Sequence, residues 1–165
     1  MQVSDPDIGA RFDRLVAEAD VSRLGLKAWG ALLRAHATLM RQLESDLEQK
    51  MGLALADFDV LAQLAGAGGA LRMTELADRA LISRSGMTRR VARLVREGLV
   101  RRANTDADAR GVVVMLTDAG QDRLTESAPV HMRSVSDLFV AKLDDHELAV
   151  LESALAKVTP DCTFG

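Results

Sequence analysis

Apolar residues recur at three- and four-residue steps through most of the chain, which is the spacing of one face of an α-helix. The pattern is longest from Leu26 to Met51, where it predicts a helix of about 25 residues that stops at Gly52. A second helix is predicted over Leu55–Leu64, before the glycine-rich run at residues 65–69 interrupts the chain. Near the N-terminus, Pro6–Ala19 fits a short helix.

Two short helices follow the glycine-rich run. Thr74 is placed to cap the first, which carries Leu76 on its apolar side. Ser83 is placed to cap the second, which extends to Glu97 and stops at Gly98. Two short helices joined by a tight turn are the outline of a helix-turn-helix.

The spacing of apolar residues changes after Gly98. Residues 99–102 are strand-like, and the β-branched run at 112–116 predicts a second strand. The polar stretch 104–111 between them predicts a loop, so the two strands form a hairpin with a long tip.

Helical spacing returns in the last third of the chain. Thr117 is placed to cap a long helix, and Asp144 with Glu147 forms a capping box that starts a final helix ending near Pro160. The apolar stripes at both ends of the chain are longer than a small domain needs for its own core.

Composition agrees with a mainly α protein, because 48% of the residues are hydrophobic but only 3% are aromatic. The single cysteine, Cys162, excludes an internal disulfide and a cysteine-based zinc cluster. The three histidines lack metal-ligand spacing, so we expect no metal and no cofactor. No apolar run is long enough to span a membrane and the N-terminus does not resemble a signal peptide, so a cytoplasmic protein is expected.

The net charge of −3 hides an asymmetry. Residues 72–110 hold ten arginines against five acids, a net charge of +5, whereas the rest of the chain is net −8. Arginine presents a planar fork that can bond phosphate or guanine with two hydrogen bonds. The segment is either a nucleic-acid surface or a solvated charged face, and charge alone does not decide between them.

The order of these elements, with their motifs, resembles the MarR family of bacterial winged helix-turn-helix transcription regulators. The resemblance extends from Leu26 to Val158, and its most specific part is Asp-x-Arg-Gly, then a strand and Leu-Thr-x-x-Gly. The matching segments are Asp57–Leu61, Met73–Asp78, Ser83–Arg102, Asp106–Gly111 and Val114–Gly120.

The resemblance implies a mainly α fold, a winged helix-turn-helix with N- and C-terminal dimerisation helices. It divides the chain into dimerisation helices at residues 1–51, a DNA-binding domain at 52–116 and further dimerisation helices at 117–165. The family also implies an obligate homodimer on double-stranded DNA, bound to a pseudo-palindromic operator.

The second helix of the motif can be divided into two faces. Met87, Val91 and Leu94 share one face and are predicted to be core. Arg89 is the expected base contact, because the N-terminal part of such a helix enters the major groove. The remaining DNA contacts expected on or near this helix are Thr74, Ser83, Arg84, Ser85, Thr88 and Arg93.

Some of these residues have simpler interpretations. Ser83 and Thr74 are explained by capping alone, and Thr88 by packing at the flank of the helix. In the hairpin, the resemblance implies that Arg110 enters the minor groove and that Asp108 braces it. An exposed ion pair is the alternative for Asp108 and Arg110.

A ligand site is implied only by the resemblance. Family members bind small anionic or phenolic ligands, and some use an Asp and two Arg that match Asp59, Arg90 and Arg102. Trp29 is a further candidate, although it fits dimer-interface core better. The alternative for Asp59 is an ion pair with one of these arginines that holds the winged domain to its neighbours.

The sequence thus predicts a homodimeric, sequence-specific DNA-binding regulator, a repressor released by a small aromatic acid or phenolic ligand. The alternatives are a DNA-binding regulator without a ligand and a winged-helix module that binds other proteins. An enzyme is not expected, because the sequence shows no nucleophile–base pair and no phosphate-binding loop.

Overall fold

The structure is a computed structural model that describes residues 11, 14–19, 21–80, 84–104 and 111–159. It contains two compact units, Met1–Met40 and Arg41–Gly165, and each is considered by itself. Ser83, Asp108, Arg110 and Cys162, which the sequence singles out, lie outside the described residues. The predicted division at residues 51 and 116 stays a prediction.

The first unit is helical where it is described. Residues 14–18 form helix, in agreement with part of the predicted segment Pro6–Ala19. Helix α2 (Arg23–Met51) begins three residues before the predicted start and ends next to Gly52, whose φ of 58° explains the stop. None of the described helices has the length and apolarity needed to cross a membrane.

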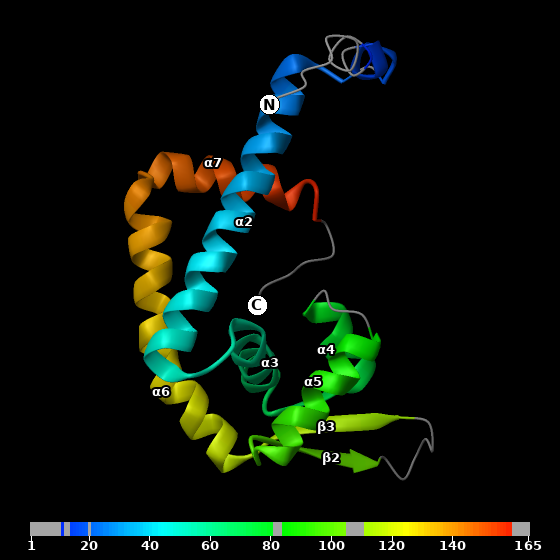
Figure 1. Ribbon diagram of the computed structural model, residues 1–165, viewed down its shortest axis with the longest axis vertical. Coiled ribbons are helices and arrows are strands. Elements are labelled where there is room, and N and C mark those ends of the chain that lie inside the picture. Colours follow the sequence, from blue (N-terminus) through cyan, green and yellow to red (C-terminus); the bar gives the residue numbers. More distant parts are fainter. Residues whose placement is uncertain (1–10, 12–13, 20, 81–83, 105–110, 160–165) are drawn as a thin grey trace, which may run out of the picture. The chain divides into compact units, whose positions relative to one another are not determined.

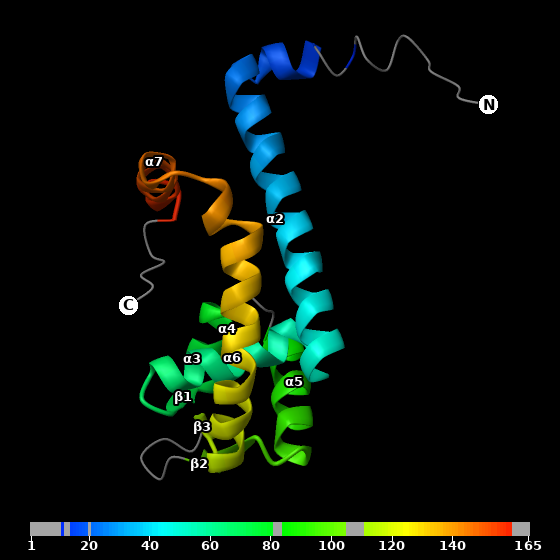
Figure 2. The ribbon, with the colours of Figure 1, turned by 90° about the vertical axis from the view of Figure 1, so that its left-hand side faces the viewer.

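The second unit is a winged helix-turn-helix with additional helices, as the sequence predicts (Figure 1). Its elements after α2 are α3 (Leu55–Gly66), β1 (Ala70–Arg72), α4 (Met73–Arg79), α5 (Arg84–Arg96), β2 (Val100–Asn104), β3 (Val112–Leu116), α6 (Asp118–Leu138), the 3-10 turn η1 (Val140–Lys142) and α7 (Asp145–Ala156). Helix α3 packs against α6, and the two can be followed together in Figure 2.

The sheet has three antiparallel strands in the order β1-β3-β2. Val114 at its centre lies between Leu71 of β1 and Arg102 of β2. The hairpin of β2 and β3, called the wing below, was expected from the sequence, but β1 was not. A strand of three residues has too few positions to show a period, so only its pairing with β3 identifies it.

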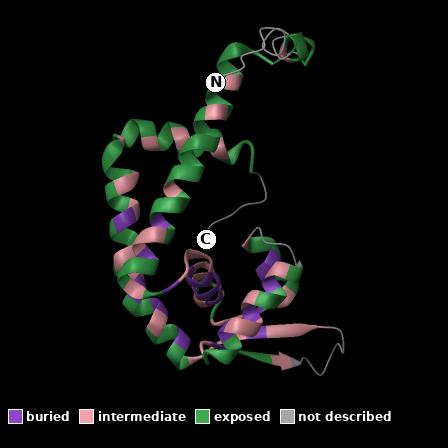
Figure 3. Cartoon of the chain, viewed as in Figure 1, coloured by how far each residue is buried: buried purple, intermediate pink, exposed green. Residues whose placement is uncertain are grey.

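One continuous core holds the second unit together (Figure 3). Leu61 and Leu64 of α3, Leu76 of α4 and Val114 of β3 are completely buried in it. Leu47, in the last turns of α2, is buried as well and joins the same core. The apolar faces predicted for these helices therefore meet around α3.

Three of the predicted helix caps lie within the described residues, and two of them are confirmed. The Thr117 hydroxyl accepts a hydrogen bond from the Gly120 N–H at 3.0 Å at the start of α6. Asp144 and Glu147 form the predicted capping box of α7. The prediction that Thr74 caps α4 is wrong, because α4 begins at Met73 and Arg72 is its N-cap residue.

The Arg72 N–H is satisfied from inside α4, since it donates to the Glu75 carboxylate at 3.1 Å. The sequence interpretation placed the cap too late because threonine is a favoured capping residue and arginine is not. Thr74 instead lies in the first turn of α4 and is exposed.

The start of α6 is fastened to the chain that follows α5. The Thr117 hydroxyl oxygen lies 2.7 Å from the Gly98 carbonyl oxygen and 2.9 Å from that of Leu99, so its single proton serves both acceptors. A Cβ at Gly120 would lie 2.0 Å from the Leu99 carbonyl oxygen, which is backbone and cannot move aside. The Leu-Thr-x-x-Gly motif is therefore the sequence of a close junction between β2 and α6.

Replacement of Gly120 by alanine should lower the free energy of unfolding by about 1–3 kcal/mol, the usual cost of overpacking. The physical reason is the contact with the Leu99 carbonyl oxygen. Gly66→Ala is the matched control, because a Cβ at Gly66, the last residue of α3, meets nothing within 4 Å. Denaturant unfolding of both variants measures the difference, and equal stabilities would contradict the assigned role of Gly120.

Candidate nucleic-acid interface

Helix α5 has one apolar face and one arginine-rich face. Met87, Val91 and Leu94 are completely buried, which confirms the core face predicted from their spacing. Arg89 and Arg96 are exposed on the remaining surface. Because the apolar face is fixed in the core, the rotation of α5 about its own axis is fixed, and so is the direction of its arginines.

The arginines of α5 line a shallow hollow with a volume of about 360 Å³. Its walls are Gly86, Arg89, Arg90, Arg93 and Arg96. Gly86 leaves room between the longer side chains, and four guanidinium groups around one hollow give it a strongly positive potential. Such a surface attracts phosphate or carboxylate oxygens.

A buried carboxylate lies behind two of these arginines. Asp57, on α3, is only 4% exposed. One of its oxygens accepts a hydrogen bond from Arg90 Nη1 at 2.9 Å, and the other accepts one from Arg93 Nη2. The carboxylate therefore bridges two guanidinium groups and ties α5 to α3.

The Asp57 carboxylate also raises the pKa of Arg93, through its hydrogen bond first and its charge second. The Glu97 carboxylate lies 3.9 Å from Arg93 Nε, one helical turn further along α5, and adds a weaker attraction. Arg93 therefore already has two acidic partners within the protein itself.

This arrangement changes the expectation for Arg93. The sequence groups it with Arg89 on the DNA face, but its guanidinium group contacts Asp57 in the structure. Arg90 and Arg93 are three residues apart and hence neighbours on the helix surface, so a long side chain at position 93 reaches either face. A DNA contact by Arg93 stays a prediction, and it would compete with the Asp57 ion pair.

Asp57 was not identified as a functional residue from the sequence. A signal was present, because Asp57, Leu61 and Leu64 follow the i, i+4, i+7 spacing of one helix face. A charged residue on an otherwise buried face requires a partner, and the arginine-rich segment was the place to find one.

The predicted ligand residues are only partly brought together. Asp59 lies near Arg90, but its carboxylate accepts a hydrogen bond from Gln63 at 3.4 Å. Arg102, on β2, donates to the Thr88 backbone carbonyl at 3.2 Å. Trp29 is 58% exposed and belongs to the first unit. The ion pair offered as the alternative for Asp59 is not what the structure gives, because Arg90 pairs with Asp57.

Asp59 has a second neighbour in His131 of α6. Burial raises the pKa of Asp59, and the hydrogen bond from Gln63 and the charges of Arg90 and His131 oppose the shift. Burial lowers the pKa of His131, against the charge of Asp59. The His131 ring lies on Phe58 with a centroid separation of 4.5 Å. This group therefore joins α3 to α6 beside the arginines of α5.

Three other residues predicted to contact DNA also lie on α5. Ser85 and Thr88 are exposed on α5, and both take part in interactions within the chain. Arg84 is the first residue of α5. Their contact with DNA stays a prediction, as does that of exposed Thr74 on α4.

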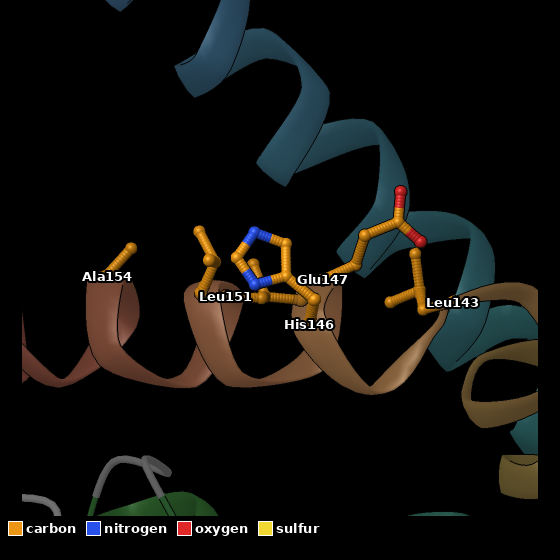
Figure 4. Close-up of a pocket in the computed structure, with 6 residues that line it drawn as sticks. Leu143, His146, Glu147, Leu151 and Ala154 are labelled. Carbon is orange, nitrogen blue, oxygen red and sulfur yellow. The ribbon is translucent and has the colours of Figure 1, made fainter.

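A second hollow lies on α7 and has a volume of about 420 Å³. His146, Leu151 and Ala154 contribute side chains from α7, and Leu143 contributes one from just before it (Figure 4). Glu147 and Val150 complete the lining. Apart from His146 and Glu147 the lining is aliphatic. Its composition differs from that of the arginine-lined hollow and suits a protein contact rather than an anion.

Helices α4 and α5 followed by the wing define a winged helix-turn-helix protein, and the arginines of α5 are suited to DNA. The MarR family model matches residues 51–111. AbsC from Streptomyces coelicolor, a MarR family transcriptional regulator, is 32% identical, with 85% of this chain and 95% of AbsC covered and a TM-score of 0.78.

A second regulator from the same organism, Sco3205, was solved in complex with DNA. It is 31% identical, with 84% of this chain and 88% of Sco3205 covered and a TM-score of 0.79. PecS from Dickeya dadantii, an HTH-type transcriptional regulator, is 28% identical over 131 residues, which are 78% of each chain. The chain belongs to the MarR family of DNA-binding transcriptional regulators, and the expectation that it is not an enzyme is confirmed.

Proposed function

We propose that the protein is a homodimeric repressor that binds a pseudo-palindromic operator, with α5 in the major groove and the wing beside it. The observation that carries the proposal is the division of α5 into a fully buried apolar face and an exposed face with Arg89 and Arg96. The similarity to Sco3205, solved with DNA, and to MarR from E. coli, solved with operator DNA at 27% identity, supports it.

Exposed apolar side chains support the dimer. In the first unit, Trp29, Leu33 and Met40 lie on one face of α2 and are 58%, 48% and 38% exposed. In the second unit, Val150 of α7 is 54% exposed at the aliphatic hollow. Large apolar side chains that share a helix face in contact with water favour association, and a second copy of the chain is the partner that fits both terminal helices.

A ligand-controlled form of this function is supported by the arginine-lined hollow. An aromatic carboxylate in that hollow would gain charge-assisted hydrogen bonds from Arg90 and its neighbours. It would also occupy the surface that α5 offers to DNA, so ligand and operator would compete. A small aromatic acid is therefore the proposed inducer class.

Arg89→Ala should weaken operator binding by about 1–3 kcal/mol per half-site and relax the base preference at one symmetric pair of positions. The reason is the loss of a two-bond contact to guanine. Binding to the DNA upstream of the protein's own gene, and to single-base variants of the bound site, measures both effects. Lys142→Ala, which removes one exposed charge at η1, is the control and should change neither. A uniform loss across all site variants would contradict base reading by Arg89.

Val150→Asp should weaken the dimer, because it places a charge in the aliphatic hollow of α7. Sedimentation at micromolar concentration should give a dimer, of twice 17.8 kDa, for the parent and a larger monomer fraction for the variant. Ala149→Asp adds the same charge on α7 outside the residues that line the hollow, and it should leave the dimer intact. A folded monomer of the parent protein would refute the proposed dimer.

Benzoate at millimolar concentration should reduce operator affinity by direct competition, and the loss should be about fivefold when its concentration is about four times its Kd. Acetate at the same ionic strength should not, since it has the carboxylate but lacks the aromatic ring. Arg90→Gln should remove the response to benzoate. Equal effects of benzoate and acetate would contradict the proposed aromatic inducer. The proposal that the protein is a DNA-binding repressor would remain.

A further inference from the structure

The bridge formed by Asp57 joins a buried carboxylate to two arginines on the surface that would face DNA. Arg90 and Arg93 line the same hollow as Arg89 and Arg96. The side chain of Asp57 is 6% exposed, that of Arg90 25% and that of Arg93 43%. The acid is therefore shielded from water, while the arginines it holds stay within reach of a partner.

The Asp57 bridge is not an efficient way to stabilise the contact between α3 and α5. A single carboxylate faces two guanidinium groups and has been removed from water, which costs free energy that an ion pair does not always restore. In the part of the chain that the structure describes, Arg90 Nε and Arg93 Nε are buried without a hydrogen-bond partner. A well-packed apolar contact between α3 and α5 would avoid both costs.

The donors that Asp57 occupies are the donors that a DNA phosphate would use. Carboxylate and phosphate oxygens both accept hydrogen bonds from the guanidinium fork in the same geometry. Arg93 is the more exposed of the two, so the acid and a phosphate compete directly for its Nη2 group. Contacts to phosphates strengthen binding to every DNA sequence alike, since they do not read bases.

We propose that Asp57 limits sequence-independent DNA binding, because its carboxylate holds Arg90 and Arg93 away from DNA phosphates and leaves Arg89 as the reader of base edges. The proposal rests on the proposed function, in which α5 enters the major groove. Asp57 itself touches no DNA and acts through the two arginines. It therefore lowers the affinity for the operator and for unrelated DNA by the same factor, and so keeps sequence-independent binding weak.

The test measures binding to the operator and to unrelated DNA over a range of salt concentrations. Asp57→Asn leaves an isosteric side chain without charge and should release at least Arg93 to a phosphate. The slope of log affinity against log salt should then steepen by about 0.9 for each additional phosphate that a protomer neutralises. Binding to the operator and to unrelated DNA should both tighten, and the ratio of the two affinities should stay unchanged. Asp137→Asn makes the same change at an exposed acid of α6 and is the control, which should leave the slope unchanged.

Two further variants separate this role from a purely structural one. Asp57→Asn combined with Arg93→Gln should restore the slope of the parent protein, because the released arginine is gone. Arg93→Gln alone should leave the parent slope unchanged, because Asp57 already keeps Arg93 from phosphates. This last measurement can overturn the proposal even when Asp57→Asn does not fold.

An unchanged or shallower slope for folded Asp57→Asn would overturn the proposal, as would a steeper slope that Arg93→Gln does not reverse. A shallower slope for Arg93→Gln alone would show that Arg93 contacts phosphate in the parent protein, and this too would overturn it. Failure of the proposed function differs visibly, because the parent protein would then show no operator preference and no response to Arg89→Ala.

Discussion

The burial of Met87, Val91 and Leu94 is the interaction on which the remaining structure depends. Three completely buried side chains on one face of a thirteen-residue helix fix both the position of α5 and its rotation about its axis. The core that receives them is supplied by α3, α4, the sheet and the first turns of α6. Every arginine of α5 then has a defined direction, although none of them is part of the core.

The basic segment of the sequence consequently has two kinds of arginine. Arg89 and Arg96 contribute positive charge to the surface, whereas Arg90 and Arg93 share the buried charge of Asp57. Arg102 donates a hydrogen bond to the Thr88 backbone carbonyl of α5, so it also helps to hold the fold together. Net charge along the sequence therefore overstates the charge that the folded surface offers to a polyanion.

Local information in the sequence was sufficient for the long helices, for the wing and for the caps at Thr117 and Asp144. These features depend on spacing or on a residue and its near neighbours. The strand β1 and the bridge at Asp57 depend on partners far along the chain, since Asp57 and Arg90 are 33 positions apart. A family resemblance directed attention to Asp59, whereas the buried position belongs to Asp57 because it shares a face with Leu61 and Leu64.

The junction at Thr117 and Gly120 has a mechanical consequence. The hydroxyl and the close backbone approach clamp the first turn of α6 onto Gly98 and Leu99, which directly follow α5. Because these contacts are made to backbone atoms at close range, the first turn of α6 cannot shift without also moving the residues that directly follow α5. The start of α6 and the end of α5 therefore form one rigid corner of the winged domain.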